Sequence, residues 1–596
     1  MRTRSIGSAL IVWVTFVFSA AASAGDPAPA RHAALHKLFH DYWEHRLRNS
    51  PERATYLGDH RYDDRLSRYD EASRLADIEA HKTFRRRLAA IPAARLSPAD
   101  ALNAELFARV LRERIELAEF PEHLMPIKQQ DAPQITLGMI QQTHPFKTPR
   151  DCANYAARLD AFPRQVDEVI AQMREGLRRG VVRSKITIEQ SLPQIDVLIV
   201  DDPVDCELYA PAKSFTASQG GDEMKQRVRE AAHTAIGGLR RLRAFLKDTY
   251  LPACRETVGY GLLPDGKRWY RRLARHHTTT SLTPEAIHQL GLDELKHIHA
   301  GMRKVMAEVE FTGDLGAFID ALRNDPAQHN KTAAEIMRRH AANLRRSDAH
   351  LPELFGVLPK TPYELKEMEP FRAPAAPAAY YYNAPDDGSR PAYFYVNTYR
   401  PETRPIYTME ALAYHEAMPG HHLQLGLAQE KKGWPDFRRF EGITAFIEGW
   451  ALYAERLGYE LGGYRDPYAR FGQLTYDAWR ASRLVVDTGI HYFGWSRDRA
   501  IAFMKANTAL SDQNIRSEID RYIAWPGQAL AYKVGQLEIL KLRRRAERTL
   551  ADRFDVRAFH DALLAEGSLP LSTLRTRMIA WIERRADAPS VPGARP

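Results

Sequence analysis

Helical periodicity runs through almost the whole chain and constrains the fold more than any other feature of the sequence. Apolar residues recur at the spacing of one helix face among many Arg, Ala, Leu and Glu, and strand signals are rare. The pattern predicts an all-α protein built mostly of long helices. Representative helices are predicted over 33–48, 71–91, 98–119, 151–178, 222–250, 283–309, 332–346, 409–430, 443–461, 466–492, 497–506, 515–523, 528–549, 556–565 and 570–585.

The composition is that of a globular chain with a large core. Of 596 residues, 44% are hydrophobic and 27% are charged, which excludes disorder and collagen-like repeats. The net charge is +10, but basic and acidic residues are intermixed and form no long block of one sign. Nucleic acid is therefore not an expected partner.

Residues 1–24 have the pattern of a secretory signal peptide. Two arginines precede an apolar run over 9–18, and Ala22-Ser23-Ala24 has the small-residue form that signal peptidase accepts. The apolar run is too short to span a bilayer. We expect cleavage after Ala24, a periplasmic or secreted mature protein and no stable membrane span. No cysteine follows the apolar run, which disfavours a lipid anchor.

Three cysteines, Cys152, Cys206 and Cys254, allow at most one internal disulfide, so disulfides do not hold this fold together. Cys206 and Cys254 form a disulfide or remain buried free thiols; the sequence leaves both open. None has the Cys-x-x-Cys spacing of a zinc site.

A proline-rich stretch over 370–405 divides the chain into an N-terminal helical lobe, 25–369, and a C-terminal catalytic lobe, 370–596, which together form one continuous domain. Within it, residues 391–398 are rich in β-branched and aromatic side chains and follow a turn signal, which predicts a small strand region. This strand lies just before the histidine-rich segment that begins at His415.

Three histidines and a carboxylate lie within eight residues at His415, Glu416, His421 and His422. The predicted helix 443–461 then carries Glu448. Two His and one Glu are a common ligand set for a catalytic zinc that keeps one position open for water.

The histidine spacing differs from the usual helical zinc motif, in which the two imidazoles are at i and i+4. Position i+4 from His415 is Pro419, which cannot ligate a metal. In an unbroken helix His421 would lie on the wrong face, and His422 about 10.5 Å along the axis. Pro419 must bulge or break the helix, and Gly420 adopts unusual dihedrals cheaply, which returns His421 to the place of an i+4 histidine.

Three motifs resemble the bacterial family filed as domain of unknown function 885. They are His-Glu-x-x-Pro-Gly-His-His from 415, Glu-Gly-Trp-Ala-x-Tyr-x-Glu from 448, and Trp-Pro-Gly-Gln-Ala-x-x-Tyr-Lys-x-Gly from 525. The resemblance covers most of the mature chain. The family name itself implies no activity.

A more distant resemblance is to helical zinc peptidases of the thimet oligopeptidase, angiotensin-converting enzyme and carboxypeptidase Taq type. It implies a two-lobed helical body around a cleft. It also implies that His415, His421 and Glu448 hold Zn²⁺ while Glu416 acts as general base toward water on the metal. The two-residue insertion leaves His422 as the alternative ligand.

Further site residues are expected around this set. Glu455, two helical turns from Glu448, is the candidate partner of a ligating imidazole, or else a surface carboxylate. The resembled peptidases use a late-helix Tyr to stabilise the oxyanion, which implies this role for Tyr532; otherwise it is a packed core residue. For substrate binding, strand 391–398 with Asn397 is expected to pair with an extended peptide. Arg483, His491 and Lys533 are expected to meet a substrate carboxylate or carbonyl.

The expected function is an exported zinc-dependent peptidase acting on short peptides. No Gly-x-Ser-x-Gly elbow, phosphate-binding loop or dinucleotide fingerprint occurs. Two alternatives remain: a metal-dependent hydrolase of a non-peptide amide or ester, and a catalytically inactive peptide-binding protein. The sequence defines no oligomeric state.

Overall fold

The computed structural model describes residues 32–130, 132–369, 373 and 376–588. The chain is 71% helical with one small sheet, which confirms the predicted all-α class. The expected signal peptide lies outside the described residues. The helices are α1(Ala33–Asn49), α2(Pro51–Tyr56), α3(Glu71–Ala89), α4(Pro98–Leu117), α5(Pro133–Met139), α6(Pro149–Arg179), α7(Lys185–Asp196), α8(Gly221–Ala244), α9(Gly266–Thr278), α10(Pro284–Glu308), α11(Leu315–Asn324), α12(Ala333–Asp348), α13(Leu351–Leu354), α14(Met409–Glu416), α15(His421–Gln429), α16(Asp436–Phe440), α17(Thr444–Leu457), α18(Pro467–His491), α19(Arg497–Asn507), α20(Asp512–Ala524), α21(Ala531–Leu550), α22(Val556–Leu564) and α23(Leu571–Asp587).

Most long helices begin where the sequence supplies a capping signal. Ser97 and Thr283 each accept a hydrogen bond from the first turn of the following helix, and proline occupies the next position in both. The predicted helix 409–430 is broken, as Pro419 requires, into α14 and α15. The π-helical turn 245–250 continues α8, so the predicted helix 222–250 spans both.

The sheet has three strands in the order β1(Tyr363–Glu367), β3(Ala392–Val396), β2(Ala379–Tyr382). β3 confirms the predicted strand, and it pairs in parallel with β1 and antiparallel with β2. Both edges of β3 are therefore occupied, so it has no free edge for a peptide. The expectation that strand 391–398 adds a substrate strand is wrong on this geometry, and the open edges belong to β1 and β2.

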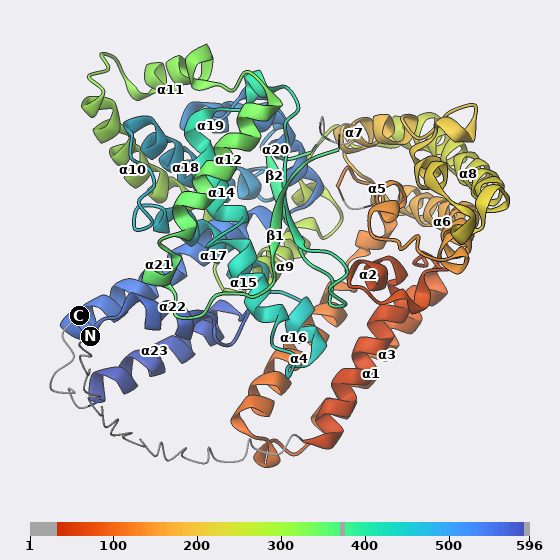
Figure 1. The fold of residues 1–596 in the computed structure, drawn as a ribbon, viewed down its shortest axis with the longest axis horizontal. Helices are drawn as coiled ribbons and strands as arrows, with labels where there is room; N and C mark the ends of the chain where they lie inside the picture. The colour runs from red at the N-terminus through yellow and green to blue at the C-terminus, as the bar shows by residue number, and fades with distance from the viewer. Residues whose placement is uncertain (1–31, 131, 370–372, 374–375, 589–596) are drawn as a thin grey trace, which may run out of the picture.

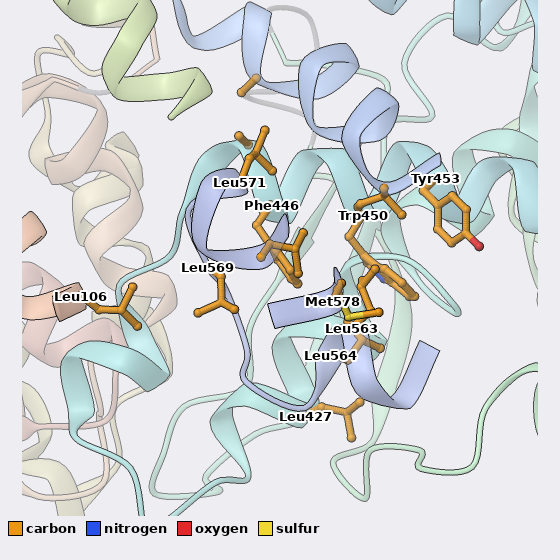
Figure 2. Close-up of a cluster of buried hydrophobic side chains, with 14 of the residues drawn as sticks. Leu106, Leu427, Phe446, Trp450, Tyr453, Leu563, Leu564, Leu569, Leu571 and Met578 are labelled. Atoms are coloured by element: carbon orange, nitrogen blue, oxygen red, sulfur yellow. The ribbon is translucent and has the colours of Figure 1, made fainter. Parts of the chain in front are cut away.

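One hydrophobic core joins the two ends of the chain. Leu106 of α4 lies in the same cluster as Phe446 and Trp450 of α17 and Met578 of α23 (Figure 2). Other clusters fill the α6–α8 arm, drawn in yellow in Figure 1, and the region around α10, α14 and α18. The division at 369/370 therefore describes chain order, whereas packing ties α1 and α4 to the C-terminal helices.

The three cysteines are free thiols in the structure. Cys206 is buried and its Sγ lies 3.3 Å from the carbonyl oxygen of Leu198. The disulfide between Cys206 and Cys254 is therefore absent, and the alternative of free thiols holds. Among the described residues, no helix is both long and apolar enough to cross a membrane.

Candidate metal centre

The break between α14 and α15 brings the last turn of one helix against the first turn of the next. His415 and Glu416 end α14, and His421 begins α15 after a turn that contains the cis Met418–Pro419 peptide bond. Gly420 is required here, because a Cβ at this position would lie 1.9 Å from the carbonyl oxygen of His415. The turn thus folds back against the end of α14.

Helix α17 holds this turn in place. The Nε1 of Trp450 donates to the carbonyl oxygens of Pro419, at 2.9 Å, and Gly420, at 3.2 Å. Trp450 is fully buried, so the Pro419 carbonyl, which has no backbone donor among the described residues, is satisfied inside the core. The same helix carries Glu448, two residues earlier, toward the turn.

His415, His421 and Glu448 converge at this point. One donor atom from each lies within 4.8 Å of the others. The Nε2 atoms of His415 and His421 lie 3.6 Å and 3.4 Å from Oε2 of Glu448, and the two rings meet edge to face. These distances leave room for one ion at the centre of the three donors.

The far side of His415 is held by a buried carboxylate and a buried arginine. Oε1 of Glu455 lies 2.8 Å from Nδ1 of His415 and 3.1 Å from Nη2 of Arg480. Glu455 is 0% exposed. This contact leaves Nε2 of His415 free to face the centre of the cluster, as in proteins where an outer carboxylate orients a ligating imidazole.

The electrostatics of the cluster are those of a cation site. Burial would lower the pKa of His415, but the neighbouring carboxylates of Glu448 and Glu455 outweigh burial and raise it to about 9. Burial would raise the pKa of Glu448, but the two imidazoles hold it well below its usual range. Carboxylates therefore dominate the site and favour a positive charge there.

The donor set fits zinc. Oε2 of Glu448 is buried and makes no hydrogen bond within the described part of the chain, although it faces two imidazole nitrogens. An unsatisfied buried carboxylate oxygen is costly unless a metal or proton meets it. Two imidazoles and one carboxylate are typical of a zinc that keeps a position for water.

His422 faces away from this cluster. Its Nδ1 lies 3.1 Å from the hydroxyl of Tyr381, and its ring packs on Tyr363 at 4.5 Å between centroids. Burial lowers the pKa of His422 to about 4. The structure thus gives His421, not His422, the position that faces Glu448.

A second group with metal-ligand chemistry lies far from this site in sequence, at His45, Asp77 and His81. Nε2 of His45 lies 2.7 Å from Oδ1 of Asp77. Arg46 and Arg114 act on this group with their positive charges, which disfavours an added cation. A variant in this group therefore serves as a control for metal bound away from the candidate centre.

The cluster lies at the floor of a cavity of about 670 Å³. Glu416, Tyr532 and Arg483 line this cavity together with His415, His421 and Glu448. Residues of α5, of α7 and of the segments beside these helices also line it, as does β2 with the residues just before it; those near α5 and α7 are Gln129, Gln130, Gln134, Ile135, Gly138, Met139, Gln194, Val197 and Leu198. A volume of this size fits a small organic ligand.

Glu416 is the carboxylate that stays free of structural partners. It is 8% exposed and makes no hydrogen bond to any other described residue. Glu448 and Glu455 have imidazole or guanidinium partners instead. Glu416 is therefore available to act on a small molecule in the cavity.

Tyr532 and Arg483 stack beside the cluster. The Tyr532 ring is parallel to that of His415 at 6.2 Å, and the guanidinium of Arg483 lies 4.1 Å from the Tyr532 centroid. Burial, followed by the charge of Glu448, raises the pKa of Tyr532, so its hydroxyl stays a proton donor. Nη1 of Arg483 is buried and has no hydrogen-bond partner in the described part of the chain, while its other nitrogens bond Tyr522 and Glu518.

Three of the expected substrate-binding residues lie outside the cavity wall. The Asn397 amide donates to the carbonyl oxygens of Ala373, Ala376 and Pro377. The ring nitrogens of His491 meet the backbone of Tyr260 and Tyr522. Lys533 bonds Asp477, Gln536 and Glu294. Their positions speak against direct substrate contact, because the polar atoms of each are committed to the fold.

Several residues that build the site escaped the sequence reasoning. Arg480 anchors Glu455, and Gly449 and Gly535 let α17 and α21 touch, since a Cβ on Gly449 would lie 2.5 Å from the Cα of Gly535. This contact sets Glu448 beside Tyr532. Both glycines lie in the family motifs. Their closeness in sequence to Glu448 and Tyr532 was the feature that could have identified them as site residues.

Asp487 fixes the turn that precedes Tyr532. Its Oδ1 accepts from the hydroxyl of Tyr270 at 2.6 Å and from the backbone N–H of Gly527 at 3.0 Å. Burial raises the pKa of Asp487 to about 7. The folded state therefore favours the protonated acid, and its stability contribution is lost as pH rises from about 4 through 7.

We expect Asp487→Asn to remove this pH dependence, because an amide oxygen accepts the same two hydrogen bonds without ionising. The free energy at stake is about 1.4 kcal/mol per pH unit over this range. Melting temperatures measured between pH 5 and pH 8 should fall less for the variant than for the natural protein. Parallel curves would show that Asp487 does not titrate in this range.

The fold and site define a large helical protein with a His/His/Glu centre at the floor of an internal cavity. The profile of the family described as bacterial protein of unknown function (DUF885) matches residues 51–578, and the chain belongs to that family. A search of curated proteins finds no significant match.

Two solved structures with the same fold come from Colwellia psychrerythraea and Shewanella oneidensis. A presumed lipoprotein from Colwellia psychrerythraea shares 25% identity at a TM-score of 0.86, over 92% of this chain and 99% of that chain. A presumed lipoprotein of unknown function from Shewanella oneidensis shares 19% identity at a TM-score of 0.69, over 91% of this chain and 99% of that one.

A third match is a presumed oligoendopeptidase F from Bacillus anthracis. It shares 10% identity at a TM-score of 0.31, over 86% of this chain and 96% of that chain. A likeness this weak supports no inference about activity.

Proposed function

We propose that this protein is a zinc-dependent peptidase that hydrolyses short peptides. The observation that carries the proposal is the convergence of His415, His421 and Glu448 beside an unpartnered Glu416 at the floor of a cavity. In the proposed site His415, His421 and Glu448 hold Zn²⁺. When bound, zinc polarises the scissile carbonyl and lowers the pKa of water.

Glu416 is the proposed general base. It borders the donor cluster, lines the cavity and makes no competing hydrogen bond with a described residue. It would take the proton from the attacking water and deliver it to the leaving amine, as general acid–base catalysis requires. Glu455 would act as a positioning residue, because its contact with Nδ1 of His415 fixes that ring.

Tyr532 is proposed to donate a hydrogen bond to the oxyanion. We expect Tyr532→Phe to lower kcat by about 10²–10³ with little change in KM, as for loss of one oxyanion donor. Steady-state kinetics checks this, and zinc content should stay unchanged. Tyr381→Phe is the matched control, because that hydroxyl faces His422 instead. Equal losses in both variants would remove Tyr532 from this role.

Two features suit a peptide. The open edge of β2 belongs to the cavity wall, so an extended backbone can pair there as an added strand. Arg483 lines the same cavity and has one buried nitrogen without a partner among the described residues, and it is proposed to meet a substrate carbonyl or carboxylate. Cavity walls on several sides favour short, unfolded chains over folded proteins.

Export is part of the proposal. The signal pattern over 1–24, with cleavage after Ala24, implies a periplasmic or secreted enzyme. The related solved structures are described as presumed lipoproteins, which is consistent with export of the family.

The test is hydrolysis of a mixture of synthetic peptides of about 5–15 residues, followed by mass spectrometry. Cleavage should stop with a zinc chelator and return with added zinc. Cleavage only of non-peptide amides or esters would favour the other hydrolase. Peptide binding without turnover in the zinc-loaded protein would favour a binding protein.

A further inference from the structure

A second cavity lies at the N-terminal end of α17, and its lining residues differ from those of the cavity at the metal centre. Its volume is about 430 Å³, and it is lined by α1, α2, α4, α9 and the connection from α16 into α17. Thr444, the first residue of α17, lines this cavity, whereas Glu448 lines the first one. Four residues of helix separate these positions by about 6 Å.

Arginines dominate the wall of this second cavity. The guanidinium-bearing residues are Arg46, Arg53, Arg109 and Arg114, against the carboxylates of Glu113 and Glu441. Positive charges therefore exceed negative ones by two, with the one histidine taken as neutral. The side chain of Arg114 keeps 30% of its exposure, so solvent ions reach the site.

Both carboxylates are already committed to other partners. Glu441 accepts from Arg46 at 3.2 Å and from Arg114 at 2.8 Å. Glu113 accepts from Arg272, which lies behind the wall, at 2.6 Å. Within the wall, Glu441 therefore pairs with Arg46 and Arg114, which leaves Arg53 and Arg109 as the arginines with the weaker carboxylate contacts.

Arg53 and Arg109 have guanidinium N–H groups that make no hydrogen bond with the described residues. Arg53 donates to the carbonyl of Phe440 at 2.6 Å, and its Nε is buried without a partner among the described residues. Nη2 of Arg109 lies 3.4 Å from Oε1 of Glu113, and this is its one ion pair with a described residue. Burial lowers the pKa of both side chains, while Glu441 beside Arg53 and Glu113 beside Arg109 oppose this lowering.

The start of α17 adds main-chain donors. Its N-cap residue is Ile443, which has no side chain able to cap the helix. The first N–H groups of a helix have no partner within it, and they lie at the positive end of the helix dipole. Thr444 and Gly442 bring this end of the helix to the cavity wall.

We propose that this cavity binds a small dianion of the phosphate-ester class. Guanidinium forks and helix N–H groups both match phosphate oxygens, and two negative charges balance the excess in the wall. The volume accommodates a phosphate together with a small organic group. The proposal does not depend on the proposed peptidase activity, because no residue of the metal centre lines this cavity.

The experiment titrates inorganic phosphate into the full-length mature protein by calorimetry at constant ionic strength. We expect one saturable site per chain. Arg109→Gln should weaken phosphate binding at least tenfold, and Arg53→Gln should do the same. Arg112→Gln is the matched control, since Arg112 is an exposed residue of the same helix outside the cavity, and it should bind phosphate unchanged.

Folding of each variant is checked by its melting temperature, and the second variant keeps the test valid if the first fails to fold. Binding of succinate with no binding of phosphate would overturn the assignment to phosphate. Phosphate affinity unchanged by Arg109→Gln and Arg53→Gln, or lost only in Arg483→Gln, would place the anion elsewhere and overturn the site. Absence of saturable phosphate binding would overturn it as well.

Discussion

Glu416→Gln should retain zinc and lose turnover. The side chain lies beside the donor cluster without belonging to it, so the amide leaves the three ligands in place but cannot accept a proton from water. General acid–base catalysis contributes about 10²–10⁴ in rate, and we expect kcat to fall toward the larger end of that range. Peptide cleavage and metal content, measured on the same preparation, check the result.

Glu448→Gln provides the contrasting control. Its carboxylate faces both imidazoles, so this variant should lose zinc as well as turnover. Full activity in Glu416→Gln would remove Glu416 from the role of base. Loss of zinc from Glu416→Gln would instead make it a ligand, and the account of the donor set would have to change.

His421→Ala and His422→Ala should differ sharply in metal affinity. Nε2 of His421 faces Glu448, whereas His422 bonds Tyr381 and packs on Tyr363. Loss of an outer partner of a ligand costs about 10–100-fold in affinity, and loss of the ligand His421 should cost more than that. His422→Ala should bind zinc with nearly unchanged affinity. Competition with a chelating dye measures both.

His81→Ala is the control for metal held elsewhere, since His45, Asp77 and His81 form the other group of donors found among the described residues. This variant should keep the zinc of the natural protein. Equal losses of zinc in His421→Ala and His422→Ala would show that the turn at Pro419 does not select His421.

Local chemistry made the α14–α15 break predictable. Pro419 cannot continue a helix, and Gly420 fits where any side chain would collide with the carbonyl of His415. The long helices were predictable because the amphipathic period is visible in sequence. The choice between His421 and His422 was not, because it depends on Trp450 of α17, which holds the turn from another helix.

Long-range partners explain why the structure places some of the expected substrate-binding residues outside the cavity wall. Lys533 bonds Asp477 and Glu294, and His491 bonds the backbone of Tyr260 and Tyr522. Contacts between residues so far apart in the chain leave no periodic pattern in the sequence from which they could be predicted.

Helix α18 presents a related difficulty for sequence reasoning. It is buried on all sides over 475–491, so no polar face distinguishes Arg480, which anchors Glu455, from Arg483, which lies against Tyr532. The strands β1 and β2 are short, and β3 occupies the centre of their sheet, which only pairing reveals.

The central claim is that His415, His421 and Glu448 hold one zinc ion. Elemental mass spectrometry of the mature protein, purified without chelator or affinity metal, tests it most directly. The account predicts about one zinc per chain, in keeping with a single three-ligand catalytic site. A chain that binds no metal even after zinc is supplied would contradict the claim and leave a peptide-binding protein as the better description.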